Sequence, residues 1–176
     1  MIEKYVKGNV YVFIDASNIY HSQKKLRWKI GFVRLKEYFE KHTTLGKIYY
    51  YTAYDPDYTQ QRKFLDLLEI SGFIVRKKKV KFIKDVGLKE GGFHKGNLDV
   101  ELTIDAVHNR DNFQSFILFS GDSDFEALIK YMKAYNKNCV VFSTKDHISI
   151  ELLKQAKFID LKKLREELEM ENPINS

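Results

Sequence analysis

The apolar residues of this chain fall into short runs that alternate with longer amphipathic stretches. Runs rich in β-branched and aromatic residues predict strands at 10–14, 47–54, 73–75, 116–119, 138–142 and, as a short edge strand, 158–160. Apolar residues at helical spacing predict helices at 33–41, 98–108, 148–154 and 161–170, one that ends at Gly72 and one that begins near 125. Strands that alternate with helices in this way build a mainly parallel sheet covered by helices on both faces. The pattern therefore predicts an α/β protein with the layers of an α/β/α sandwich.

Length and composition narrow this picture. A chain of 176 residues is long enough for one well-packed domain, which we expect at residues 1–171, with a frayed tail at 172–176. No apolar run approaches the ~20 residues of a membrane span, and the first residues lack a signal-peptide core. We therefore expect a cytoplasmic protein with no membrane partner. Cys139 is the single cysteine, which excludes an internal disulfide and a thiolate zinc cluster.

Aspartates follow two of the predicted strands. Asp15 ends the strand at 10–14, and the turn Ser120-Gly-Asp-Ser-Asp124 follows the strand at 116–119. Parallel strands deliver the residues at their carboxyl ends to one edge of the sheet, where such folds bind ligands. Asp99, in the first turn of the helix at 98–108, could reach the same place. Asp122 could instead cap the following helix, and Asp124 and Asp99 could interact favourably with the dipole of a helix.

Three converging carboxylates repel one another, and a divalent cation is their natural compensation. A donor set made only of oxygens suits Mg²⁺ or Mn²⁺. Asp105 lies about 240° around the helix from Asp99, so we leave it out of the metal site. Asn18, one turn after Asp15, could orient a ligand or a water, although capping the following helix is its plainer role.

The positive charge is concentrated in one segment. The chain has a formal net charge of +6, and residues 76–95 alone hold eight Lys or Arg against two acidic residues. This segment is suited to contact with the phosphates of a nucleic acid, and equally to a sheet edge protected by lysines. The candidate phosphate contacts are Arg76, Lys77, Lys79, Lys81 and Lys95. Residues 85–92 have the composition of a mobile loop.

Three sequence blocks together resemble a known family. Ile14-Asp-Ala-Ser-Asn18, Lys95-Gly-Asn-Leu-Asp99 and Ser120-Gly-Asp-Ser-Asp-Phe125 are similar to the signature blocks of the NYN domain, and more narrowly of its LabA-like branch. Ala16 stands where the family commonly has glycine. The resemblance implies a PIN-like (Rossmannoid) fold and a metal-dependent nuclease that usually acts on RNA. It also implies roles for single residues: Asp15, Asp99 and Asp122 as metal ligands, Asp124 as a further ligand or its support, Asn18 as an orienting residue, and Lys95 as a phosphate contact.

The favoured hypothesis is a nuclease that hydrolyses phosphodiester bonds through a water activated by Mg²⁺ or Mn²⁺. The expected substrate is RNA, single-stranded or structured, with DNA as an alternative. A second hypothesis is a non-catalytic module that binds RNA or a regulatory protein and keeps the acidic cluster as a structural metal site. A haloacid-dehalogenase-like phosphatase is disfavoured because residue 17 is serine, where that chemistry needs a second acid. A dinucleotide-binding protein is disfavoured because no glycine-rich loop follows the first strand.

Overall fold

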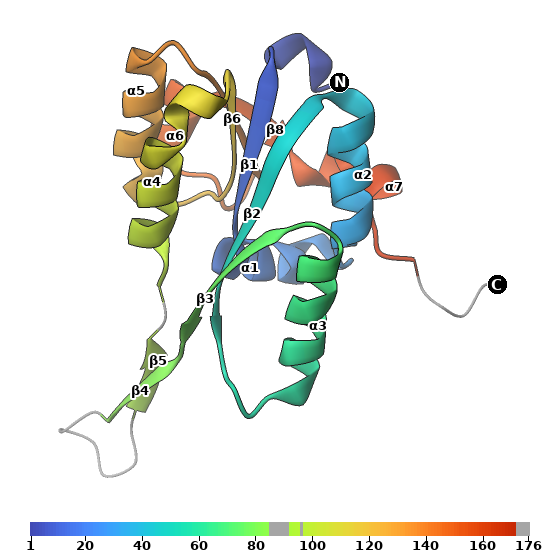
Figure 1. Cartoon of the computed structure of the whole chain (residues 1–176), viewed down its shortest axis with the longest axis vertical. Helices are drawn as coiled ribbons and strands as arrows, with labels where there is room; N and C mark the ends of the chain where they lie inside the picture. The colour runs from blue at the N-terminus through green and yellow to red at the C-terminus, as the bar shows by residue number, and fades with distance from the viewer. Residues whose placement is uncertain (85–91, 96, 172–176) are drawn as a thin grey trace.

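The computed structural model describes residues 1–84, 92–95 and 97–171, and its centre is a parallel sheet (Figure 1). Six strands pair in the order β3-β2-β1-β6-β7-β8. Their bounds are β1 Asn9–Asp15, β2 Thr44–Tyr54, β3 Ile74–Lys79, β6 Ser115–Phe119, β7 Asn138–Ser143 and β8 Lys157–Asp160. An antiparallel hairpin of β4 (Lys81–Lys84) and β5 (Gly92–Lys95) continues from β3. The predicted α/β class and the parallel sheet are confirmed.

Helices cover both faces of the sheet (Figure 1). One face carries α1 Ala16–Leu26, α2 Phe32–His42, α3 Thr59–Ile70 and α7 Arg165–Leu168. The opposite face carries α4 Asp99–His108, α5 Glu126–Ala134 and α6 Ile150–Gln155. Short 3₁₀ turns lie at η1 Glu3–Tyr5, η2 Arg110–Asn112, η3 Ser123–Phe125 and η4 Leu161–Leu164.

The central strands are apolar throughout because both of their faces are buried. Along β1, Val12 and Ile14 pack into the core beneath α1 and α2, while Phe13 packs into the core beneath α4 and α5. Phe13 stacks on Tyr49 of β2 with ring centroids 5.0 Å apart. The alternation of side chains across a strand thus divides one continuous apolar run between two cores.

Two local predictions need correction. The segment 161–170 is not one helix: it begins with the 3₁₀ turn η4 and continues as the four-residue helix α7. The 3₁₀ turn still buries Leu161 and Leu164 completely and α7 buries Leu168, so the apolar spacing is satisfied without one regular helix. Of the loop expected at 85–92, Gly92 belongs to β5 and the rest lies outside the described residues, as does the tail at 172–176. In the part of the chain that the structure describes, no helix combines the length and apolarity needed to cross a bilayer.

The strand order creates a crevice at one place on the sheet. From β1 the chain builds outward through β2 to β3, and it then returns to place β6 on the other side of β1. Neighbouring connections leave β1 and β6 toward opposite faces, which opens a crevice at their carboxyl ends. The strands run downward in Figure 1, and the β4–β5 hairpin projects below this carboxyl edge. The aspartates that follow β1 and β6 therefore meet at the crevice.

Candidate metal and nucleic-acid site

Three carboxylates meet at the carboxyl edge. Asp99, Asp122 and Asp124 each offer an oxygen that lies within 4.8 Å of the other two. Asp99 is the first residue of α4, whereas Asp122 and Asp124 lie in the turn after β6. Oxygens bound to one ion at ~2.1 Å lie at most about 4.2 Å apart, so a small inward movement would suffice for all three to hold one Mg²⁺ or Mn²⁺. The donor set and its spacing therefore fit such an ion.

Asp15 lies at the end of β1 and is buried. Its Oδ1 caps α1, accepting hydrogen bonds from the backbone N–H groups of Ser17 and Asn18 and from the Ser17 hydroxyl. Among the described residues, its Oδ2 accepts only the hydroxyl of Ser120, at 3.1 Å. A carboxylate oxygen has two lone pairs, so Oδ2 retains one for a further ligand. The cap of α1 is thus Asp15, whereas the sequence had suggested Asn18.

The turn after β6 is held by its own side chains. The fully buried Ser120 hydroxyl donates to Asp15 and accepts the backbone N–H of Asp122, at 3.2 Å, so it connects the two acidic segments. Asp122 in turn accepts the backbone N–H of Asp124, at 3.0 Å. Gly121 is required by contact: a Cβ there would lie 2.2 Å from the carbonyl oxygen of His147. These contacts fix the backbone of the turn and one carboxylate oxygen of Asp122.

The electrostatics of Asp99 show how unfavourable this arrangement is without a cation. Burial raises the pKa of Asp99, and the nearby charges of Asp15, Asp122 and Asp124 raise it further, although a hydrogen bond from Asn97 opposes them. A raised pKa means that the fold disfavours the charged form of the carboxylate. A divalent cation would remove this repulsion.

Buried polar atoms beside the cluster are left without partners. Neither Oδ1 of Asn18 nor Nε2 of His147 has a hydrogen-bond partner among the described residues. Burial lowers the pKa of His147, and the charges of Lys25 and His21 on α1 lower it further. Buried polar atoms without a partner are rare, and they mark places where a water, an ion or a ligand completes the hydrogen bonding.

A cavity of about 300 Å³ adjoins the acidic cluster. It lies between the amino-terminal ends of α1, α3 and α4 and the carboxyl end of β2. Asp15 and Asp99 line the cavity and at the same time belong to the acidic edge. Its remaining lining is largely aromatic and polar: Ser17, Tyr20, His21, Tyr50, Tyr51, Thr52, Gln61 and Asn97, with Ala16, Ala53, Leu98 and Leu102.

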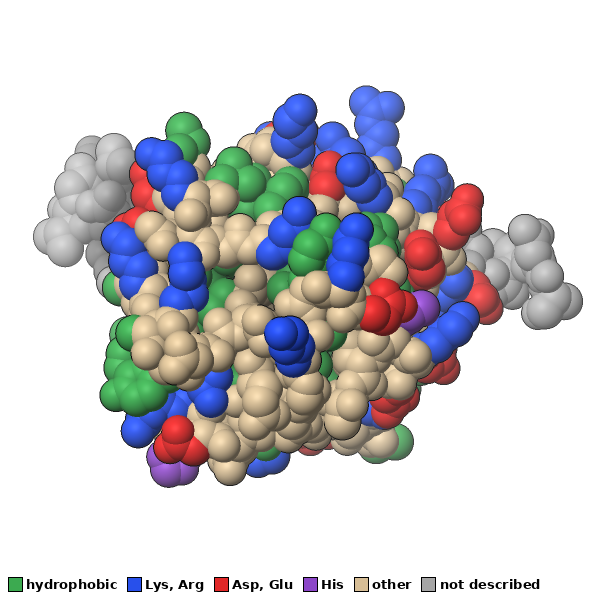
Figure 2. All heavy atoms as spheres, turned by 90° about the horizontal axis from the view of Figure 1, so that it is seen from above, with side chains coloured by type: hydrophobic (Ala, Val, Ile, Leu, Met, Phe, Trp, Pro, Cys, Tyr) green, Lys and Arg blue, Asp and Glu red, His purple; other side chains and the backbone are tan. Residues whose placement is uncertain are grey.

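The basic residues of β3 have acidic neighbours. Arg76 forms a two-bond pair with Asp105 of α4, at 2.8 and 3.3 Å, while Lys77 pairs with Glu69 of α3, at 3.1 Å. Lys79 is exposed at the end of β3, and Lys81 and Lys95 occupy opposite positions on the β4–β5 hairpin. Figure 2 views the top of the molecule in Figure 1, where β1 and β2 begin, and shows further Lys and Arg side chains among acidic ones. Basic side chains therefore also lie away from the hairpin, but there they are interspersed with acidic ones.

The family model described as the NYN domain matches residues 9–167. The chain belongs to this family. It is 33% identical over 162 residues to the "Low amplitude and bright protein LabA" of Synechococcus elongatus, a match that covers 90% of this chain and 86% of LabA. A crystal structure of a Vibrio parahaemolyticus protein of unknown function has the same fold, with a TM-score of 0.73 and 25% sequence identity. That match covers 88% of this chain and 93% of the other.

Membership in the NYN family confirms the resemblance carried by the three sequence blocks. It makes the chain a nuclease-type or regulatory module of the PIN-like superfamily. Within this NYN domain the structure gathers Asp99, Asp122 and Asp124, whereas Asp15 lies outside this group of three and is linked to Asp122 through the hydroxyl of Ser120. Asp105 points elsewhere, toward Tyr51 and Arg76.

Sequence reasoning missed two parts of the site in this NYN domain. The sequence predicts Ser120 only as part of a turn, although a small polar residue between a buried strand and an aspartate is a signal for a supporting hydrogen bond. The cavity was missed entirely, because Tyr20, Tyr51 and Gln61 come from three separate elements. No spacing rule connects residues that only the fold brings together.

Proposed function

We propose that this NYN domain hydrolyses phosphodiester bonds in RNA with the help of Mg²⁺ or Mn²⁺. The observation that carries the proposal is the group of three carboxylates within 4.8 Å. None of the three forms an ion pair with a described residue. Unpaired, mutually repelling carboxylates destabilise a fold, so their presence is best explained by a ligand that neutralises them.

Each residue of the site has a proposed role. Asp99, Asp122 and Asp124 would hold the ion, and Asp15 would complete its shell through the free lone pair of Oδ2. Asn18 would orient a ligand or a water through its unpartnered Oδ1. Bound there, a divalent ion lowers the pKa of a water and neutralises charge on the scissile phosphate. Ser120 supports two of these aspartates through one hydroxyl and is a positioning residue.

The hairpin supplies the proposed contacts to the RNA backbone. Lys81 and Lys95 are partners in the backbone register of β4 and β5, which places two basic residues at the same end of the hairpin. Lys79 leads into them from β3. Arg76 and Lys77 would contact phosphate only by exchanging their present acidic partners. Changing Lys81 and Lys95 to Gln should flatten the dependence of log affinity on log salt by ~0.7 for each phosphate that the variant no longer binds.

The decisive experiment is a cleavage assay on labelled RNA and DNA, with Mg²⁺ or Mn²⁺ and with EDTA. The wild type should cleave RNA only with metal, and Asp122→Asn should not cleave. Asp111→Asn makes the same chemical change at a largely exposed position on η2 and should retain full activity. A folded wild type that binds RNA but does not cleave it with either metal would overturn the proposal and favour a non-catalytic binding module.

A further inference from the structure

The cavity beside the acidic edge has the size and position of a binding site. Its volume of about 300 Å³ is at the lower end of the range for small-ligand pockets, ~300–1,000 Å³. It therefore has room for one small planar group and not for a stacked pair. Asp99 belongs both to the acidic cluster and to the cavity lining, so a polymer bound at the cluster has its next group at the cavity.

Three polar side chains of the cavity wall, Gln61, Thr52 and Asn97, already form hydrogen bonds within the protein. The amide of Gln61 donates to the carbonyl of Ala53 and accepts the backbone N–H of Asp55. The hydroxyl of Thr52 donates to the carbonyl of Ala53, and the amide of Asn97 bonds to Asp99 at both ends. Side chains that already hydrogen-bond within the protein shape the cavity wall, but they have little capacity left to hydrogen-bond the polar edge of a ligand. With these three side chains engaged, the aromatic rings of the lining are the surfaces best suited to hold a ligand, and they contact it by its flat faces.

Tyr20 provides an aromatic surface at this cavity. It lines the cavity from α1 and is 57% exposed, although most large aromatic side chains in this fold are buried. The ammonium group of Lys24 lies 4.4 Å from the centre of its ring. An exposed aromatic ring with a neighbouring cation is the combination with which proteins hold the bases and phosphates of single-stranded nucleic acids.

We propose that this cavity binds one unstacked base of a single-stranded RNA, and that Tyr20 stacks on that base. This proposal rests on the proposed function, which identifies the polymer as RNA. What it adds is a preference for single-stranded RNA over duplex RNA. A base in a duplex is paired and stacked on both sides, so it cannot enter the cavity unless the duplex opens. Because the base is held by its faces, the four bases bind with similar affinity. The site is therefore selective for single strands and tolerant of sequence.

Binding measured in EDTA tests this proposal independently of cleavage. Fluorescence anisotropy would compare short labelled single strands of A, U and C with a blunt RNA duplex. Tyr20→Ala should weaken single-strand binding by about 5- to 150-fold, because stacking on an aromatic side chain contributes ~1–3 kcal/mol per base. Tyr20→Phe keeps the ring and should bind as the wild type does. The duplex should bind more weakly, and Tyr20→Ala should not change its affinity.

The chain offers a matched control in Tyr135, at the other end of the sheet. Tyr135 is 46% exposed and has the guanidinium of Arg110 4.8 Å from its ring centre, so it resembles Tyr20 in both exposure and cation contact. Tyr135→Ala should leave single-strand affinity unchanged. Equal losses in the two alanine variants, or unchanged affinity in Tyr20→Ala, would overturn the cavity proposal.

The two proposals fail in different ways. A wild type that cleaves RNA, with a Tyr20→Ala variant that binds single strands normally, refutes the cavity proposal alone. A wild type that never cleaves, with a Tyr20→Ala variant that loses binding, refutes the nuclease proposal and supports the cavity. A strong preference for one base among the homopolymers would show readout of the base edge and overturn the stacking proposal.

Discussion

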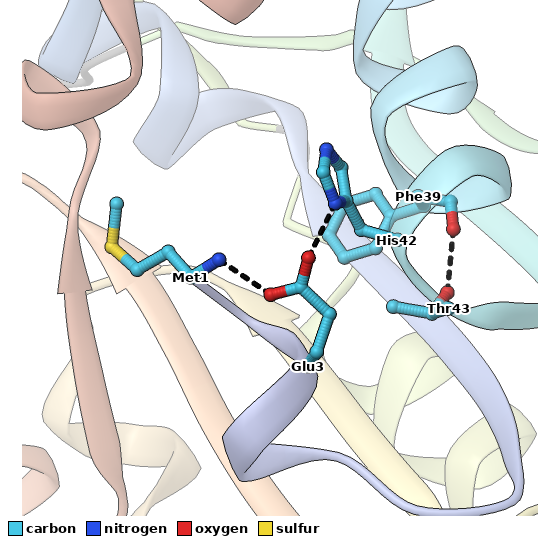
Figure 3. A network of polar contacts seen from close by, with 5 residues as sticks. All are labelled: Met1, Glu3, Phe39, His42 and Thr43. Atoms are coloured by element: carbon cyan, nitrogen blue, oxygen red, sulfur yellow. Dashed lines mark hydrogen bonds and ion pairs between the residues drawn. The ribbon is translucent and has the colours of Figure 1, made fainter.

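The pKa of a carboxylate is shifted in opposite directions at two sites, one at each edge of the sheet. At the amino edge, Glu3 lies between the amino group of Met1 and the imidazole of His42, as Figure 3 shows. The hydrogen bond from the amino terminus, with smaller help from its own backbone and from His42, lowers the pKa of Glu3 to about 2. At the carboxyl edge, Asp99 faces other aspartates and its pKa is raised. Glu3 is therefore satisfied by the fold, whereas Asp99, Asp122 and Asp124 have no ion-pair partner among the residues that the structure describes.

The same contrast recurs within the single helix α4. Asp99 at its start faces Asp122 and Asp124. Asp105, nearly two turns later, accepts the hydroxyl of Tyr51 and both bonds from Arg76. Composition and helix propensity cannot distinguish these two aspartates, but their neighbours do. A carboxylate without a cation near it is the better indication of function.

The largest expected effect separates these two aspartates. Asp99→Asn should reduce cleavage by at least about 100-fold, since even residues that merely support metal ligands cost ~10–100-fold when they are removed. It should leave the metal-free fold equally stable or more stable. Asp105→Asn should instead lower the free energy of unfolding by about 1–2 kcal/mol, the range for a half-exposed charged contact. Thermal melts and cleavage assays on both variants provide the comparison.

The stability of the metal-free wild type and that of Asp99→Asn should depend on pH in different ways. Because the fold raises the pKa of Asp99, the metal-free wild type should lose stability as pH rises between the unfolded and folded pKa values, and remain less stable above them. This loss should be absent in Asp99→Asn. A metal-free Asp99→Asn that melts well below the wild type at neutral pH would assign Asp99 a structural role and contradict the contrast.

A bound divalent cation should remove the repulsion among the aspartates at the carboxyl edge and so stabilise the fold. Mg²⁺ or Mn²⁺ at about 100 times its Kd should raise the free energy of unfolding by about 2.7 kcal/mol, through mass action on the folded state. A melt with and without metal measures this, and Asp122→Asn should show little of it, while Asp111→Asn keeps the full response. An equal shift in Asp122→Asn would place the bound ion elsewhere on the molecule.

The sequence predicted much of this contrast, and the reasons are physical. Strands β1 and β6 are continuous apolar runs because both faces are buried, and each is followed by an aspartate, so the edge where they meet could be inferred. The separation of Asp99 from Asp105 followed from helix geometry alone. These inferences need only local periodicity and the rule for parallel sheets.

Other features depend on contacts between distant segments, which no local pattern encodes. The pairing of Arg76 with Asp105 joins β3 to α4, and it changes a candidate phosphate contact into part of an ion pair. The hairpin that carries Lys81 and Lys95 was hidden because a run of lysines does not show the alternation of a half-buried strand. The cavity beside the acidic cluster likewise exists only once three helix ends and β2 are in place.

Gly121 tests whether the carboxyl edge depends on close backbone packing. In Gly121→Ala the new Cβ would lie 2.2 Å from the carbonyl oxygen of His147, so the segment after β7 must move. Overpacking of this kind costs about 1–3 kcal/mol. We expect a lower melting temperature and weaker metal binding together, because Asp122 follows directly. Gly121 does not have a positive φ, so the clash alone is the cost there, whereas Gly72→Ala, with only the flexible end of Lys36 at 3.4 Å, measures the backbone strain of a positive φ without a clash. Metal affinity unchanged in Gly121→Ala would separate the packing from the site.

The smallest expected effect is at the amino edge. Glu3→Gln removes the charge that the amino group of Met1 and His42 stabilise, but Glu3 is half exposed, so the loss at neutral pH should be less than about 1 kcal/mol. The sign follows from the lowered pKa: the contribution of Glu3 is complete above its ordinary pKa of 4.5 and disappears as pH falls toward about 2. The difference in melting temperature between wild type and variant should therefore shrink over that interval, while cleavage at neutral pH stays unchanged. A loss of activity in Glu3→Gln would mean that Glu3 is coupled to the acidic cluster. It would contradict the view that only the carboxylates at the carboxyl edge take part in function.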